Sequence, residues 1–201
     1  DNGISRIEIY SQFSLFDYRN SIDGEITNII RFNNKLYLST TKGVFVKADN
    51  NEFVRLNNID MACWDMTVYQ NKLFFAASNG IFVENQGKIE ALIKNIFALT
   101  LNGSSIHKNK LYAGLLTGLA EVDINTRDNY QMIKGIDTEI RQIKQDKDGI
   151  LWLNSPLKGI IKYNEKDRQT EYLSTKNGLP SILGNNLNII DGEIVITTVN
   201  G

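Results

Sequence analysis

The sequence predicts an all-β protein, a β-propeller built from four-stranded antiparallel blades. Three observations predict this fold class: a unit of roughly 40 residues recurs along the chain, each unit contains a tight turn, and the strand after the turn is apolar on both faces. The unit is clearest at residues 33–46, which read Asn-Asn-Lys-Leu-Tyr-Leu-Ser-Thr-Thr-Lys-Gly-Val-Phe-Val.

A glycine marks the same position in every copy of the unit. The marker glycines are Gly3, Gly43, Gly80, Gly118, Gly159 and Gly201. Successive markers are 40, 37, 38, 41 and 42 residues apart, so the 201 residues hold five repeat periods. A repeat array of this kind counts as one domain, and residues 1–201 are therefore predicted to form a single propeller domain or a propeller fragment.

The turn and the strand after it explain why the unit folds into blades. Two-residue connections of the type that favours positive φ predict tight hairpins, and they occur at Asn33-Asn34, Gln70-Asn71, Lys108-Asn109 and Asp191-Gly192. After the first of these turns, Leu36 and Leu38 alternate with Tyr37. A sheet with one face in water would alternate apolar with polar residues, so each sheet is expected to be covered on both faces by its neighbours.

Each full period supplies four strands, which we name A to D from the propeller axis outward. The predicted strands of the four complete blades are residues 26–32, 35–40, 44–47 and 52–56; 64–69, 72–77, 81–84 and 88–93; 101–107, 110–115, 119–124 and 130–133; and 140–145, 150–154, 160–163 and 169–173. In the third blade, residues 96–99 are an alternative start for strand A, because Asn102-Gly103-Ser104-Ser105 has poor strand propensity.

The two ends of the chain are predicted to hold incomplete blades. Residues 3–9 and 13–18 read as strands C and D, and residues 187–190 and 193–198 read as strands A and B. The two pairs can combine into one composite blade, which closes a ring of five and removes exposed sheet edges. The alternative is that the chain is part of a longer propeller.

Composition excludes several classes of function. Lys and Arg number 22 against 23 Asp and Glu, so the sequence has no electrostatic footprint for nucleic acid, and no nucleic-acid partner is expected through this segment. His107 is the only histidine and Cys63 the only cysteine, which leaves no material for a Ser-His-Asp triad or a multi-histidine metal site. We therefore expect no catalytic residues, no metal and no cofactor.

Residues 137–184 carry a family resemblance. Asp146-Lys147-Asp148-Gly149-Ile150-Leu151-Trp152-Leu153, then Lys158 to Asn164, then Asn177-Gly178-Leu179-Pro180 resemble the two-component regulator propeller repeat. The resemblance implies a part of a seven-bladed propeller in the periplasmic sensor region of a bacterial hybrid two-component system. It further implies a membrane-anchored protein, an oligosaccharide ligand, fused downstream kinase modules, and no catalytic activity in this segment.

The rim on which the D–A and B–C connections emerge is the expected binding face, since a propeller displays variable loops there. The candidate ligand-binding residues on this rim are Arg19, Asn20, Trp64, Asp65, Arg141, Gln142, Lys176 and Asn177. An aromatic ring with charged hydrogen-bond donors suits an acidic sugar. Binding would shift a population between two arrangements of domains or of the protomers of a homodimer.

Two other functions fit the same fold. One is a surface or secretion-associated scaffold whose propeller face binds a protein or lipopolysaccharide. The other is a five-bladed glycosidase, for which the inner-strand acids Glu25, Asp65 and Glu139 are the available carboxylates.

Overall fold

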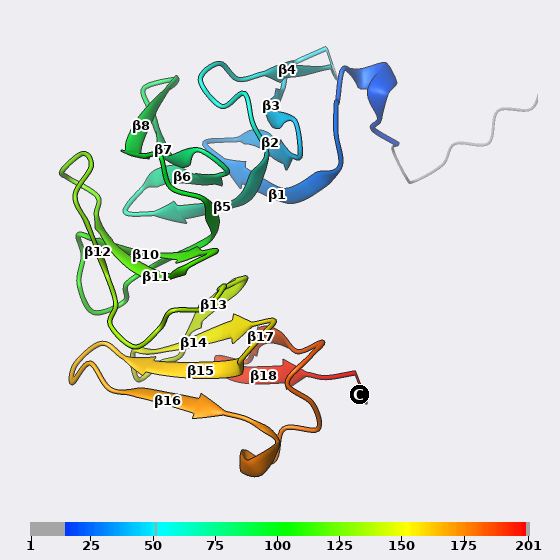
Figure 1. Ribbon diagram of the computed structural model, residues 1–201. Coiled ribbons are helices and arrows are strands. Elements are labelled where there is room, and N and C mark those ends of the chain that lie inside the picture. The colour runs from blue at the N-terminus through cyan, green and yellow to red at the C-terminus, as the bar shows by residue number, and fades with distance from the viewer. Residues whose placement is uncertain (1–14, 51, 200–201) are drawn as a thin grey trace, which may run out of the picture.

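A computed structural model describes residues 15–50 and 52–199 of the chain. These residues form four antiparallel sheets of four strands and one sheet of two strands, which follow one another along an arc (Figure 1). In every four-stranded sheet the strands pair in chain order, as propeller blades require. The inner strands of successive sheets, β1, β5, β9, β13 and β17, contact one another in that order.

The strand bounds are as follows. Blade 1 contains β1 (Ile26–Phe32), β2 (Lys35–Thr40), β3 (Gly43–Lys47) and β4 (Phe53–Arg55). Blade 2 contains β5 (Cys63–Tyr69), β6 (Lys72–Ala77), β7 (Gly80–Asn85) and β8 (Lys88–Lys94). Blade 3 contains β9 (Ala98–Gly103), β10 (Lys110–Leu115), β11 (Gly118–Asp123) and β12 (Tyr130–Met132). Blade 4 contains β13 (Gln142–Gln145), β14 (Ile150–Ser155), β15 (Gly159–Asn164) and β16 (Thr170–Leu173), and the last sheet contains β17 (Asn186–Ile190) and β18 (Glu193–Thr197).

The predicted hairpins form where the turn residues accept positive φ. Asn33 and Asn34 have φ of 47° and 60°, and Asp191 and Gly192 have φ of 52° and 80°. The marker glycines are required by a close approach of two backbones. A Cβ on Gly80 would lie 2.3 Å from the carbonyl oxygen of Ile93. These features fix the same blade geometry in each repeat.

Strand A of blade 3 differs from the prediction of residues 101–107. β9 spans Ala98–Gly103, so it shares residues 101–103 with the prediction and 98–99 with the alternative start. Lys108-Asn109 lies in a six-residue loop rather than in a two-residue hairpin. Tyr69 of blade 2 causes the change. Its ring packs where a Cβ of Gly103 would be, and its hydroxyl donates to the carbonyl oxygens of Ser104 (3.0 Å) and His107 (2.8 Å), which draws this loop out of the ladder.

The motif Asp146-x-x-Gly149-x-Leu151-Trp152 folds as a capped turn. The Asp146 carboxylate accepts from the backbone N–H of Asp148 (3.0 Å) and Ile150 (2.9 Å), and from the indole Nε1 of Trp152 (2.8 Å). Gly149 supplies the left-handed conformation at φ 86°. The residues that carry the family resemblance here are therefore structural.

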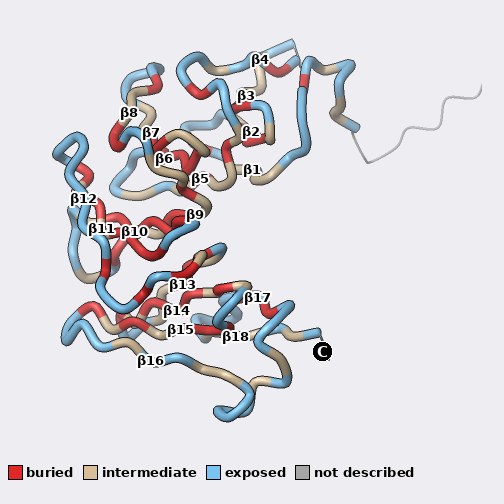
Figure 2. The backbone as a smooth tube through the Cα atoms, in the orientation of Figure 1, coloured by how far each residue is buried: buried red, intermediate tan, exposed pale blue. Residues whose placement is uncertain are grey.

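The core lies between neighbouring sheets, as Figure 2 shows by the buried segments inside the arc. One buried cluster joins blades 1 and 2, a second joins blades 2 and 3, and a third joins blades 3 and 4. Tyr37, Phe74, Tyr112 and Trp152 occupy one repeat position, at which packing between blades is expected. The first three are buried, whereas Trp152 is only partly buried and has Lys162 Nζ 4.6 Å from its ring centroid. This arrangement confirms an all-β fold of four-stranded antiparallel blades.

The incomplete blades are only partly covered by the described residues. The predicted strand at 3–9 and the first two residues of that at 13–18 lie outside them. Residues 15–18 do not form a strand, because Asp17 caps a short 3-10 helix, η1 (Tyr18–Asn20). The composite blade and the total number of blades therefore stay predictions.

Candidate functional site

The two rims of the propeller differ in chemistry. One rim, here the A–B/C–D rim, is formed by the connections at residues 33–34, 48–52, 70–71, 86–87, 104–109, 124–129, 146–149, 165–169 and 191–192. The other, the B–C/D–A rim, is formed by residues 15–25, 41–42, 56–62, 78–79, 95–97, 116–117, 133–141, 156–158 and 174–185. Seven large apolar side chains on the B–C/D–A rim are exposed: Leu15, Tyr18, Met61, Leu116, Leu157, Ile182 and Leu183. Within the described residues, the connections of the A–B/C–D rim expose none.

All eight predicted residues lie at or next to the B–C/D–A rim. Arg19 and Asn20 belong to η1, and Lys176 and Asn177 belong to η2 (Thr175–Asn177). The two short helices have the same build, a capping box closed by an asparagine. Asn177 Oδ1 accepts from the backbone N–H of Ser174 (3.1 Å), and the guanidinium of Arg19 pairs with Asp17 at 2.7 Å. Lys176 and Arg19 are exposed, with Arg19 held by Asp17, whereas the two asparagines close turns.

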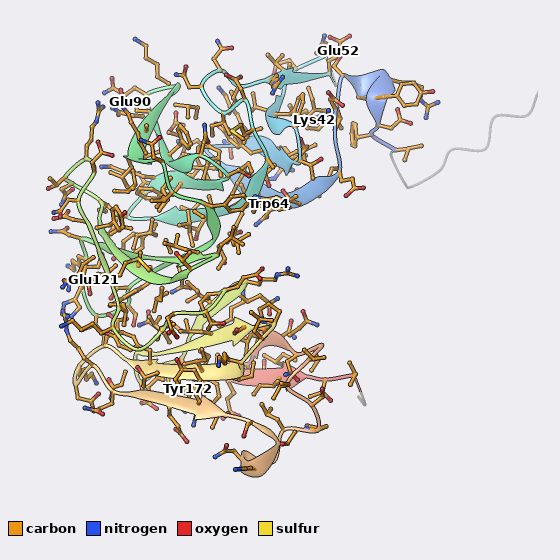
Figure 3. All side chains as sticks on the ribbon, in the orientation of Figure 1. Lys42, Glu52, Trp64, Glu90, Glu121 and Tyr172 are labelled. Carbon is orange, nitrogen blue, oxygen red and sulfur yellow. The ribbon has the colours of Figure 1, made fainter. Side chains whose placement is uncertain are left out.

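Trp64 is the second residue of β5, the inner strand of blade 2, and lies on the concave side of the arc (Figure 3). Its ring stacks on Phe97 with centroids 6.1 Å apart and planes at 26°, and its Nε1 donates to Ser78 Oγ at 3.0 Å. Phe97 and Ser78 lie in neighbouring D–A and B–C connections and were not predicted. The pair forms a partly exposed aromatic platform at the rim.

Asp65 is a node that joins three inner strands. Its Oδ1 accepts from Asn28 Nδ2 of β1 (2.5 Å) and from its own neighbour Met66 N–H (2.8 Å), and its Oδ2 accepts from Thr100 Oγ1 (2.8 Å) and Leu101 N–H (2.9 Å) of β9. Burial raises the pKa of this carboxyl, and the four hydrogen bonds oppose the rise. Both oxygens are engaged within the protein, so Asp65 acts as a clamp between blades.

Gln142 occupies the equivalent place in blade 4. Its Oε1 accepts from Asn154 Nδ2 (3.1 Å) and from the backbone N–H of Leu187 in β17 (2.9 Å), and its Nε2 lies 3.5 Å from Asn186 Oδ1. Arg141, next to it, is exposed and pairs with Glu139 at 2.5 Å. Gln142 thus links β13 to β17, and its Nε2 atom contacts the exposed residue Asn186.

The residues of these nodes share one register position. Each pairs with a residue of strand B that lies four positions before the marker glycine, or five in blade 4. The set is Asn28, Asp65, Thr100, Gln142 and Asn186, which pair with Ser39, Ala76, Gly114, Asn154 and Thr197. When the repeats are aligned on their inner strands, this position is polar in every repeat, so the sequence alone could have identified it. Of the eight predicted residues, four lie at the two inner-strand nodes, namely Trp64, Asp65, Arg141 and Gln142. The other four lie in two exposed turns, namely Arg19, Asn20, Lys176 and Asn177.

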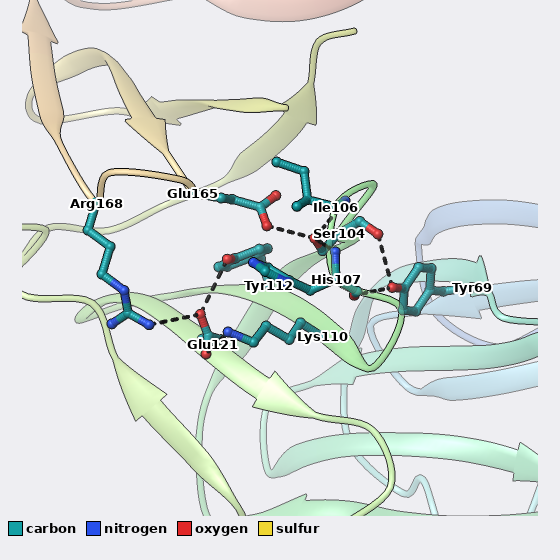
Figure 4. A network of polar contacts seen from close by, with 9 residues as sticks. All are labelled: Tyr69, Ser104, Ile106, His107, Lys110, Tyr112, Glu121, Glu165 and Arg168. Carbon is teal, nitrogen blue, oxygen red and sulfur yellow. Dashed lines mark hydrogen bonds and ion pairs between the residues drawn. The ribbon is translucent and has the colours of Figure 1, made fainter. Parts of the chain in front are cut away.

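A buried polar network locks blade 3 to blade 4 (Figure 4). Glu165 accepts from Ser104 Oγ at 2.6 Å and from the amide of Gln145, and Ser104 Oγ in turn accepts from the backbone N–H of His107 at 2.9 Å. Burial raises the pKa of the nearby Tyr112 phenol, and the carboxylates of Glu165 and Glu121 add to the rise. His107 is exposed and contributes to this turn through its backbone, since its N–H donates to Ser104 Oγ and its carbonyl oxygen accepts from the Tyr69 hydroxyl.

Cys63 is fully buried, and burial raises the pKa of its thiol. A thiol that stays protonated at neutral pH is a poor nucleophile and a poor metal ligand. The described residues contain no group of three or more His, Cys, Asp or Glu that could hold a metal ion.

The fold is that of the β-propellers, and solved structures of this class resemble the chain. The extracellular domain of BT4673 from B. thetaiotaomicron superimposes with a TM-score of 0.74 at 13% identity over 87% of this chain and 26% of its own. BT4673 is named as a one-component system in one structure and as a hybrid two-component system in another. The extracellular domain of the hybrid two-component system BT3049 from the same organism gives a TM-score of 0.68 at 18% identity over 87% and 25%. Virginiamycin B lyase from Staphylococcus aureus gives 0.63 at 13% identity over 88% and 71%.

These likenesses agree with the family that residues 137–184 resemble. The chain spans about a quarter of the length of the two extracellular domains. No protein-family model and no curated protein matches the sequence. Among the described residues, no helix has the length and apolar character needed to cross a membrane.

Proposed function

We propose that this chain is part of the extracytoplasmic sensor domain of a bacterial two-component regulator. The domain recognises an oligosaccharide at the B–C/D–A rim and signals to fused kinase modules of a membrane-anchored protein. The observation that carries the proposal is the concentration of exposed apolar side chains and of the Trp64–Phe97 platform on one rim, in a fold shared with extracellular domains of hybrid two-component systems.

Aromatic rings suit the apolar faces of sugar rings, and nearby amides and cations suit their hydroxyl and acidic groups. Trp64 and Phe97 supply the rings, and Arg141, Gln142 and Lys176 supply polar groups along the same rim. A ligand that contacts two such positions would favour one arrangement of the domain over another. Differential affinity for the two arrangements is the thermodynamic source of the signal.

Calorimetric titration of the chain with a panel of neutral and acidic oligosaccharides tests the proposal. Trp64→Ala and Phe97→Ala are expected to weaken binding about tenfold or more, as each removes one face of the platform. Tyr130→Ala is the matched control, because Tyr130 is an exposed aromatic on the outer strand β12. Equal loss of affinity in all three variants, or no binding to any member of the panel, would contradict the proposal.

A scaffold that binds protein or lipopolysaccharide is the second candidate. Leu116 and Leu157, in successive B–C connections, expose 45% and 65% of their surface, and aliphatic side chains suit a protein or acyl chain better than a sugar. Leu157→Ser would then abolish partner capture while leaving sugar binding intact. For the glycosidase alternative, Asp65 and Glu139 are already engaged by four hydrogen bonds and by Arg141, and turnover of arabinan lost on Asp65→Asn would be its evidence.

A further inference from the structure

A cavity of about 300 Å³ lies between blades 3 and 4. Both blades are complete and pack directly on each other, so the cavity is bounded on both sides by a full sheet. Its volume is at the lower end of the range of small-molecule sites, roughly 300–1,000 Å³, and so suits a ligand smaller than an oligosaccharide. The residues that line it are Gln131, Met132, Ile133, Lys134, Tyr163 and Arg168, none of which belongs to the predicted ligand-binding residues.

The corresponding cavity between blades 2 and 3 has an acid that this one lacks. It is lined by Glu90 of β8 and by Arg127 of the next C–D connection, and these two side chains form an ion pair. In the strand register, Glu90 lies opposite Val83, three residues after the marker glycine of blade 2. At the same distance from the marker glycine of blade 3, Glu121 lies opposite Gln131. Gln131 therefore takes the place of Glu90 without its charge.

The cations of the cavity between blades 3 and 4 are consequently poorly compensated. The guanidinium of Arg168 lies 4.0 Å from the Glu121 carboxylate (Figure 4). The same carboxylate is already engaged by Lys110 at 2.7 Å and by the Tyr112 hydroxyl at 3.3 Å. Lys134 makes no ion pair within the described residues, and the lining contains no acid. The local potential therefore favours an anion.

Tyr163 supplies a hydrogen-bond donor at the wall of the cavity. Its side chain is buried, with an exposed fraction of 1%, and its hydroxyl makes no hydrogen bond with any described residue. Val122 holds the equivalent position in blade 3, opposite Leu111 as Tyr163 is opposite Leu151, and has no hydroxyl. Burial raises the pKa of the Tyr163 phenol, so the group stays protonated at neutral pH and can donate. A buried donor without a protein partner favours a ligand that accepts a hydrogen bond.

We propose that this cavity binds a small organic carboxylate that carries a short apolar or aromatic group. The guanidinium of Arg168 offers a planar fork for the carboxylate, Lys134 adds a point charge, and the Tyr163 hydroxyl donates to it. Met132 and Ile133 provide the apolar surface for the rest of the ligand. The cavity is separate from the residues proposed to bind an oligosaccharide, so this inference does not rest on the proposed function. A ligand held by both blades stabilises their junction, because it binds the folded state only.

Calorimetric titration of the chain with benzoate and hexanoate, with their uncharged amides and with inorganic phosphate tests the proposal. We expect at least one carboxylate to bind at least tenfold more tightly than its amide, which has the same shape without the charge, and than phosphate, which has charge without an apolar group. Its affinity should fall as salt rises from about 50 to about 300 mM, because exposed cations are screened. Equal affinities for carboxylate and amide, equal affinities for carboxylate and phosphate, or no binding of either carboxylate would overturn the proposal.

The variant Gln131→Glu tests the missing acid directly. It gives Arg168 the partner that Arg127 has in Glu90, and we expect the affinity for the carboxylate to fall at least tenfold. Gln131 is exposed on the edge strand β12, so the change leaves the core untouched. An unchanged affinity in Gln131→Glu would contradict the proposal.

Arg168→Gln is expected to weaken the carboxylate at least tenfold as well. Arg127→Gln is the matched control, since Arg127 lies in the C–D connection of the preceding blade and pairs with Glu90. Equal losses of affinity in the two variants would mean that Arg168 acts only through the general charge of the protein, and would overturn the site.

Tyr163→Phe keeps the ring and removes the hydroxyl. We expect the affinity for the carboxylate to fall about fivefold while the midpoint of thermal unfolding stays unchanged, because the hydroxyl has no protein partner to lose. A wild-type affinity in this variant would exclude Tyr163 as the donor and contradict the proposed site. Trp64→Ala should leave carboxylate binding intact, so failure of this site and failure of the proposed function are distinguishable.

Discussion

The nodes at Asp65 and Gln142 occupy the same register position, yet they hold their blades together differently. Asp65 is a carboxylate that accepts four hydrogen bonds and joins β1, β5 and β9. Gln142 is a neutral amide that accepts two and joins β13 to β17. Hydrogen bonds to an ionised acceptor are about twice as strong as those between neutral groups.

The difference teaches which inner-strand residues are free to meet a ligand. A carboxylate near a propeller axis suggests ligand binding or acid–base chemistry when only the sequence is read. At Asp65 the donors of two neighbouring blades use both oxygens, so the charge serves the contact between blades 1, 2 and 3. The Gln142 amide has one weak contact, at 3.5 Å to the exposed Asn186, and can exchange that contact for a ligand at low cost.

Asp65→Ala is expected to cause the largest loss of stability among the variants at the two nodes. It leaves Thr100 Oγ1, Asn28 Nδ2 and the Leu101 N–H without their acceptor, and we expect a loss of about 3 kcal/mol in the free energy of unfolding. Urea unfolding measures the loss. Alkylation of Cys63 gives a local readout, because this single buried thiol lies next to the node and should react faster when blades 1 and 2 separate. Unchanged alkylation would mean that Asp65 does not hold this junction.

Asp65→Asn should cost about 2 kcal/mol, because its amide group places a donor against either the Leu101 N–H or the Met66 N–H. The shape of the side chain is kept, so the variant separates the contribution of the acceptor from that of packing. A stability equal to that of the wild type would show that the charge and the second acceptor oxygen are not needed. Thermal unfolding with the alkylation assay distinguishes these outcomes.

Gln142→Ala should cost about 1 kcal/mol, since only two acceptor bonds are lost in a partly exposed place. The expected loss in the free energy of unfolding is smaller than that of Asp65→Ala. The ratio of the two losses tests directly whether the Asp65 node is the stronger junction. Both variants are measured in the same urea series, with Thr100→Val as a control that removes one donor of the Asp65 node. A larger loss at Gln142 than at Asp65 would reverse our ranking of the two junctions.

The sequence was sufficient for most of the fold because each repeat carries its own turn chemistry. The residues that accept positive φ and the marker glycines act within one blade, so the bounds of β2, β6 and β10 follow from local pattern alone. Strand A of blade 3 could not be predicted in this way. Its register depends on Tyr69 of the preceding blade, which has no counterpart in a local pattern.

The candidate site was less predictable for the same reason. All eight predicted residues lie at or next to the expected rim, and their role in binding stays a prediction. Three of the donors around Asp65 come from residues 35 to 37 positions away in the chain.

Arg141→Ala is expected to have the smallest effect on the stability of the protein among these variants. Arg141 is exposed and pairs with Glu139 at the surface, and such pairs contribute less than about 1 kcal/mol. The midpoint of urea unfolding should therefore be unchanged, while affinity for an acidic oligosaccharide should fall if the rim beside Gln142 binds it. Arg127→Ala, which breaks a surface pair with Glu90 on the far rim, is the matched control. If Arg141→Ala destabilises the protein as much as Gln142→Ala, then this residue belongs to the junction and the rim beside it is structural.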